Sequence, residues 1–86
     1  MILRNHGLLT CASTVPDAFL AMFILQRSCE IQIQAQSTGV ELRPIPAPIL
    51  AGIQAQAEQV TRSMGGALAW PGILRKLDRE SPGYKD

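Results

Sequence analysis

The sequence predicts an α/β chain in which a short β-hairpin is followed by about three helices. Two short apolar runs flank the turn-forming residues Asn5, His6 and Gly7, and helix-periodic apolar residues follow them. The chain has 86 residues, 47% of them hydrophobic, which is enough for one small domain or for a part of a larger one. This composition excludes a disordered polar chain.

Residues 1–12 are predicted to form the hairpin. Residues 2–3 and 8–11 supply the apolar extended segments, and Gly7 between them can adopt a positive φ angle. Because a strand pair this short is not stable by itself, we expect it to join a larger sheet.

A long helix is predicted within residues 14–37, running from about residue 15 to residue 36. Thr14 can cap its start, Pro16 is tolerated in the first turn, and Asp17 lies near the positive end of the helix dipole. Gly39 follows the helix and is expected to stop it.

This helix carries two apolar stripes rather than one. The first stripe contains Val15, Ala18, Met22, Cys29 and Ile33, and the second contains Leu20, Ile24, Ile31 and Ala35. A helix on the surface of a monomer normally shows a single stripe. Two interpretations remain open: the central helix of a small helical bundle, or a crossover helix packed between a sheet and a layer that this chain lacks.

The remaining chain is predicted to hold a linker, two further helices and a tail. The linker covers residues 38–47, where alternating prolines favour an extended path. Residues 48–80 are assigned to the two helices. The first is expected to end at Gly65-Gly66 and the second to begin near Pro71. The tail comprises residues 81–86.

Charge and hydropathy exclude several classes of partner. Eight Lys and Arg residues against seven Asp and Glu residues give a net charge of +1, and no basic stretch is interleaved with aromatic residues. We therefore expect no nucleic-acid partner and no membrane partner. No apolar run approaches the ~18 residues of a membrane span, and residues 1–7 do not resemble a signal peptide. The expected location is cytoplasmic, with Cys11 and Cys29 as free thiols.

Taken alone, the residues contain no complete active site. His6 is the only histidine, and a catalytic zinc site needs about three protein ligands. Cys11 and Cys29 do not show the spacing of a known zinc pattern, and a lone turn histidine is most often solvated. Gly65-Gly66 lacks the Lys-Ser/Thr of a phosphate-binding loop.

The segment Leu-Arg-Asn-His-Gly-Leu-Leu-Thr at residues 3–10 resembles the strand-turn segment of the class II aldolase and adducin family. Residues 14–19 are similar to the helix that follows this motif, and the tail from Ala69-Trp70-Pro71 to Asp86 resembles the C-terminal end of a less characterised branch. The resemblance covers essentially the whole chain. It implies the C-terminal segment of a three-layer α/β/α domain.

The resemblance also implies a metal site. In that family a divalent metal, usually Zn²⁺, is held by a His-x-His pair and by a later histidine in an Asn-His-Gly-like motif, the position of His6 here. The metal polarises a carbonyl or enediolate oxygen of a sugar phosphate or a similar hydroxy-carbonyl substrate. This chain has no His-x-His pair and lacks the segment that carries the family's acidic residue. We therefore expect a fragment that is inactive alone.

Family aldolases are commonly tetramers, so the resemblance implies a homo-oligomer, and it makes Tyr84 a candidate for proton transfer. A tail tyrosine that only packs is the simpler alternative. Three functions stay open: part of a metal-dependent aldolase or epimerase, a non-catalytic scaffold of the adducin type, or an independent small helical domain that binds an unrelated partner. The residues alone do not distinguish an enzyme from a non-catalytic protein.

Overall fold

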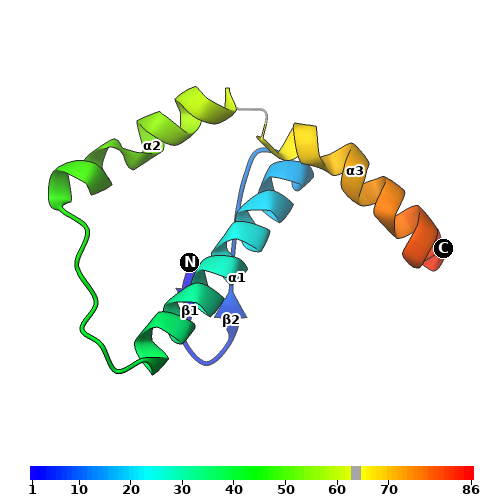
Figure 1. The fold of residues 1–86 in the computed structure, drawn as a ribbon. Helices are drawn as coiled ribbons and strands as arrows, with labels where there is room; N and C mark the ends of the chain where they lie inside the picture. Colours follow the sequence, from blue (N-terminus) through cyan, green and yellow to red (C-terminus); the bar gives the residue numbers. More distant parts are fainter. Residues whose placement is uncertain (63–64) are drawn as a thin grey trace.

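The computed structural model describes residues 1–62 and 65–86 of the chain. Its elements in order are β1 (Ile2–Leu3), β2 (Gly7–Leu8), α1 (Val15–Ser37), α2 (Ala47–Thr61), α3 (Gly65–Glu80) and the short 3₁₀ helix η1 (Pro82–Lys85). The predicted α/β class, a short hairpin followed by three helices, is confirmed (Figure 1).

The hairpin is held by strand pairing and by a tight turn. β1 and β2 are antiparallel, with Ile2 opposite Leu8 and Leu3 opposite Gly7. Asn5 adopts φ 58° and Gly7 adopts φ 136°, a region that glycine reaches without a steric cost. The amide of His6 donates to the carbonyl oxygen of Leu3 at 3.2 Å, which closes the turn.

α1 begins where its sequence predicts. The backbone N–H of Asp17 donates to Oγ1 of Thr14 at 3.3 Å, so Thr14 caps the helix, and Pro16 lies in the first turn. The helix ends at Ser37, one residue beyond the predicted end. Its first apolar stripe lies beside the hairpin, where the hydroxyl of Thr10 donates to the carbonyl oxygen of Ala18 at 3.0 Å.

α2 stands apart from the other helices. Pro46 precedes it and Pro48 lies in its first turn, as the alternating prolines predict. The described part of the helix ends at Thr61, and its predicted extension through Met64 lies outside the described residues. Among the described residues, the only extensive contact between helices joins α1 and α3, whose N-terminal parts lie side by side in Figure 1.

The predicted start of the third helix is wrong. α3 begins at Gly65, so Gly65 and Gly66 open a helix instead of ending one, and Pro71 lies inside the helix. The reason is a contact distant in sequence: the amide of Gly66 donates to Oδ1 of Asp17 at 3.1 Å. The N-termini of α1 and α3 therefore meet at one carboxylate, which satisfies an amide at the start of α3.

The described residues form no buried hydrophobic core. α1 and α3 are also joined by an edge-to-face pair, in which the ring centroids of Phe19 and Trp70 lie 5.7 Å apart. The radius of gyration is 16.2 Å, against about 12 Å for a compact chain of this length. Over residues 1–62 and 65–86, no helix has both the length and the apolar composition to cross a membrane.

Candidate functional site

His6 lies in the hairpin turn, between Asn5 and Gly7, and the residue is exposed. Strand pairing on both sides and the bond from its own amide to Leu3 fix its backbone. The turn therefore presents a free imidazole at the surface of the hairpin. A neutral imidazole supplies one nitrogen ligand to a metal ion.

The described residues supply this one donor but not a complete ligand set. Across residues 1–62 and 65–86, no three His, Cys, Asp or Glu side chains lie together as a metal site requires. Cys11 is an exposed free thiol, and Cys29 is a half-buried one on α1. A catalytic metal at His6 would need its other ligands from beyond these residues.

Tyr84 in η1 is held by two neighbours. Its hydroxyl donates to Oδ1 of Asp78 at 2.9 Å, and Nζ of Lys85 contacts the same oxygen at 2.6 Å. The Lys85 ammonium also lies 5.6 Å from the centre of the Tyr84 ring. Partial desolvation, and then the hydrogen bond to Asp78, raise the pKa of Tyr84 above its usual value.

The pKa values of the two partners of Tyr84 are shifted in the directions that an ion pair requires. The hydrogen bond from Lys85, followed by the one from Tyr84, lowers the pKa of Asp78. The hydrogen bond to Asp78 raises the pKa of Lys85. At neutral pH the cluster therefore holds a carboxylate, an ammonium and a protonated phenol. The sequence predicts a role for Tyr84 but for neither partner: Asp78 lies on α3, and η1 holds Tyr84 and Lys85 against the end of that helix.

His6 and Tyr84 are not brought together within the described chain. Figure 1 shows the hairpin alongside α1, whereas the C-terminus lies at the far end of α3. A single reaction centre that uses both residues would need His6 of one copy and Tyr84 of another. Both assignments remain predictions.

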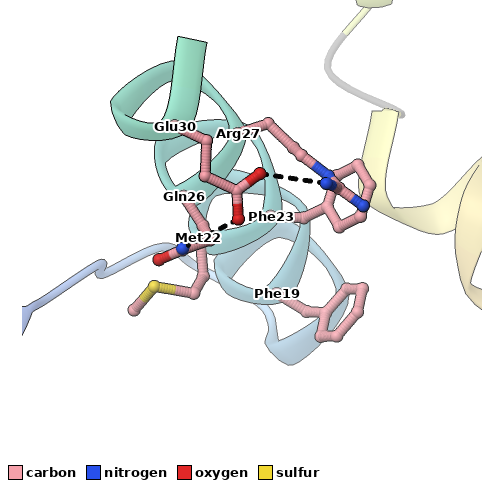
Figure 2. A pocket seen from close by; sticks show the side chains of 6 residues that line it. All are labelled: Phe19, Met22, Phe23, Gln26, Arg27 and Glu30. Atoms are coloured by element: carbon pink, nitrogen blue, oxygen red, sulfur yellow. Dashed lines mark hydrogen bonds and ion pairs between the residues drawn. The ribbon is translucent and has the colours of Figure 1, made fainter. Parts of the chain in front are cut away.

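A shallow hollow runs along one side of α1 (Figure 2). It is lined by Phe19, Met22, Phe23, Gln26, Arg27 and Glu30, all from this one helix. Nη1 of Arg27 contacts Oε2 of Glu30 at 2.9 Å, and Nε2 of Gln26 donates to Oε1 of Glu30 at 3.2 Å. These two bonds lower the pKa of Glu30, with the bond from Gln26 as the larger cause.

The charged side chains that line this hollow are paired with neighbours on the same helix. The Arg27 guanidinium also lies 5.5 Å from the centre of the Phe23 ring, so both charged groups already have partners. Pairs at spacings of three and four residues are common on exposed helices, and this spacing is the sequence signal for them. Glu30 is therefore ion-paired and is not a free base.

The comparisons with known proteins agree with the motif around His6. Residues 1–33 match the family described as the Class II Aldolase and Adducin N-terminal domain. The matched segment contains the hairpin and most of α1. The predicted resemblance to the class II aldolase and adducin family is confirmed.

Individual relatives extend this match over the whole chain. A Pseudomonas aeruginosa protein, provisionally named as an aldolase class 2 protein, is 57% identical over 99% of this chain and 34% of its own length. A Caulobacter vibrioides protein with the same kind of name is 42% identical over 100% of this chain and 34% of its own. Human beta-adducin is 49% identical over 48% of this chain and 6% of its own. No solved structure matches the chain.

Proposed function

We propose that this chain contributes His6 as one metal ligand of a class II aldolase-type protein that acts on sugar phosphates or similar hydroxy-carbonyl compounds. The observation that carries the proposal is the exposed imidazole in the fixed turn of the matched segment. Metal dependence is general among class II aldolases, and an imidazole nitrogen is a ligand that zinc accepts.

The chain alone supplies only part of such a site. It spans 34% of the length of the two bacterial relatives, and we propose that it corresponds to their C-terminal part. The other ligands and the acidic residue would then come from the portion that the chain does not cover. When bound, the metal would polarise the substrate's carbonyl oxygen. His6 would hold one coordination position, and the strand-paired turn would fix the direction of its ring.

Tyr84 is proposed as a proton donor in the same protein. Its raised pKa keeps the hydroxyl protonated at neutral pH, and Asp78 orients it. The free thiols Cys11 and Cys29 are compatible with a reducing, cytoplasmic setting, which we also propose.

The decisive experiment joins this chain to the remainder of a relative. Residues 1–86 replace the matching segment of the Pseudomonas aeruginosa protein, and bound metal is measured by mass spectrometry after dialysis. We expect about one tightly held metal ion per chain in the chimera. His6→Ala should lose most of this metal because a ligand is removed, while the helical circular dichroism stays unchanged.

The matched control is Arg4→Ala, which alters an exposed side chain of the same turn and should retain the metal. Full metal content in the His6→Ala chimera would show that the ligand assignment is wrong. A folded chimera and a folded relative that both hold no metal would contradict the enzyme proposal as well.

That second outcome would favour a scaffold of the adducin type. The observation behind this alternative is the 49% identity to human beta-adducin over 43 residues, a match that covers about half of this chain. Such a protein would keep the fold for contacts with other proteins and would need no metal at His6.

A further inference from the structure

The side chain of Thr10 joins the hairpin to α1. Its hydroxyl donates to the carbonyl oxygen of Ala18 at 3.0 Å, across eight residues of sequence. Among the hydrogen bonds of the described residues, this one alone connects the hairpin segment, residues 1–12, with α1. The contact is partly buried, so water competes with it less than with an exposed pair.

This bond lies at the base of the hairpin, and the strand pairing extends from there to the turn. The amide of Leu9 donates to the carbonyl oxygen of Met1 at 2.9 Å, so the pairing reaches the residue next to Thr10. At the other end, the amide of His6 donates to Leu3 and closes the turn. A continuous series of backbone hydrogen bonds therefore connects the anchored residue to the turn that holds His6.

The other contacts between the hairpin and α1 do not fix a direction. β2 contacts α1, and the half-buried residues of the hairpin segment besides Thr10 are Leu3 and Leu8. Apolar contact is non-directional, whereas a hydrogen bond constrains both a distance and an angle. A strand pair this short is also not stable by itself. The position of the hairpin on α1 therefore depends on the bond from Thr10.

The acceptor belongs to the first turn of α1, where the capped start of the helix fixes the backbone. The amide of Ala18 donates to the carbonyl oxygen of Thr14 at 3.0 Å. In an α-helix the carbonyl oxygen of Ala18 accepts from the amide of Met22, and a carbonyl oxygen can accept a second hydrogen bond. Removing the hydroxyl of Thr10 therefore leaves no unpaired acceptor.

We propose that Thr10 is a positioning residue for His6. Its hydroxyl holds the hairpin on α1 and thereby sets where the imidazole stands relative to ligands supplied by the remainder of the protein. Groups that orient a metal ligand without touching the metal typically change metal affinity by about 10–100-fold. The metal part of this inference rests on the proposed ligand role of His6, whereas the anchoring can be tested without metal.

The first experiment measures amide hydrogen exchange by NMR in the 86-residue chain. Thr10→Val removes the hydroxyl and keeps the β-branched shape. The amides of His6 and Leu9 should exchange about five-fold faster, as the loss of one hydrogen bond predicts. Thr10→Ser retains a donor and should match the parent chain. The amide of Gly66, bonded to Asp17 between α1 and α3, should keep its rate in every variant.

The matched control is Thr61→Val. It makes the same chemical change at a hydroxyl that donates to the carbonyl oxygen of Ala57 at 2.8 Å, a bond within α2. The exchange of His6 and Leu9 should be that of the parent chain. Helical circular dichroism checks that each variant is folded, and Thr10→Ala removes the same hydroxyl if Thr10→Val does not fold.

The second experiment uses Co²⁺ as the probe in the chimera with the Pseudomonas aeruginosa protein. Thr10→Val should lower the Co²⁺ affinity about ten-fold and change the visible absorption of the bound ion, which reports the arrangement of its ligands. Thr10→Ser and Thr61→Val should match the parent chimera. A residue that only stabilised the fold would shift the thermal unfolding midpoint and leave the absorption spectrum unchanged.

Two results would overturn the proposal. Unchanged exchange at His6 and Leu9 in Thr10→Val would show that the hairpin does not depend on this bond. Faster exchange with an unchanged Co²⁺ affinity and spectrum would show that Thr10 does not position the imidazole. A parent chimera and a relative that both hold no metal would contradict the ligand role of His6, and the exchange rates would then decide alone whether Thr10 fixes the turn.

Discussion

Tyr84 belongs to a cluster of three side chains at the C-terminal end, and desolvation followed by the hydrogen bond to Asp78 raises its pKa. The Asp78 carboxylate accepts from both the phenol and the Lys85 ammonium, so each group stabilises the charge state of the next. All three residues are exposed, and solvent screens part of this effect. The cluster acts mainly on the orientation of η1 against α3.

Asp78→Asn is expected to lower the pKa of Tyr84 toward its ordinary value. The substitution removes the negative charge that disfavours the phenolate, although partial desolvation of the ring remains. Ultraviolet absorbance of the phenolate during a pH titration reports this directly, because Tyr84 is the only tyrosine. Asp86→Asn is the control, since it removes the same charge from a carboxyl group that makes no bond to Tyr84. Equal midpoints in the two variants would show that Asp78 does not set this pKa.

The same cluster defines a pH window for the contact between η1 and α3. The pKa of Asp78 is lowered, so its stabilising effect is present above the ordinary aspartate pKa and is lost as pH falls through the lowered one. The pKa values of Tyr84 and Lys85 are raised, so their effect is lost as pH rises through those values. The contact between η1 and α3 should therefore be most stable at neutral pH.

Sequence patterns locate single functional candidates better than they locate their partners. The Asn-His-Gly turn marks His6 because its signal lies in adjacent residues. The bond between Tyr84 and Asp78 forms where η1 contacts the end of α3, and nothing in the spacing of six residues predicts it.

At the level of elements, the junction of α1 and α3 carries most of the packing in the described chain. The carboxylate of Asp17 accepts from Oγ1 of Thr14 at 2.7 Å and from the amide of Gly66 at 3.1 Å. Gly66 is buried against the first turn of α1. A Cβ atom at Gly66 would lie 2.5 Å from the backbone nitrogen of Asp17 and from the carbonyl carbon of Pro16.

Gly66→Ala is accordingly expected to destabilise the junction by about 1–3 kcal/mol, because the backbone must move to relieve the overlap. Urea unfolding followed by the fluorescence of Trp70, the only tryptophan, measures the change. Gly72→Ala is the control in the same helix. Its nearest new contact is Nη2 of Arg75 at 3.8 Å, and it should stabilise α3 by up to about 1 kcal/mol. Equal stability of the two variants would contradict the close approach at Gly66.

The elements that follow from local signals were predicted well, and the one that depends on a distant contact was not. Thr14, Pro16 and Asp17 mark the start of α1 because a cap, a proline and an acidic residue act within one turn. The start of α3 depends on a hydrogen bond between residues 49 positions apart.

On the scale of the whole molecule, the chain is elongated, with principal extents of 47, 31 and 22 Å. Large apolar side chains on α1, α2 and the hairpin stay exposed, among them Ile2 at 70% and Ile33 at 66%. Small domains normally bury such residues in a core. This surface is available to a second copy or to the remainder of a protein as long as the bacterial relatives.

Denaturant unfolding should reflect this exposure. The slope of the unfolding free energy against urea concentration scales with the area exposed on unfolding, and the monomer has about 70% of the area to expose that a compact chain of its mass would have. We expect the measured slope at low protein concentration to be about 70% of the slope of a compact chain of this mass. A slope typical of a compact domain of 86 residues would mean that the chain folds more tightly by itself.

Residues 38–46 connect α1 to α2, and among the described residues α2 contacts neither α1 nor α3 extensively. The linker therefore adds little to the packing of the chain. The linker and α2 therefore act on the contact between α1 and α3 only by setting the effective concentration of one helix near the other. Loop-closure entropy grows slowly, by about 0.6 kcal/mol for each doubling of length. Insertions between Thr38 and Pro46 would consequently leave the junction at Asp17 almost as stable as before, so the length of this stretch can change without loss of the contact between α1 and α3.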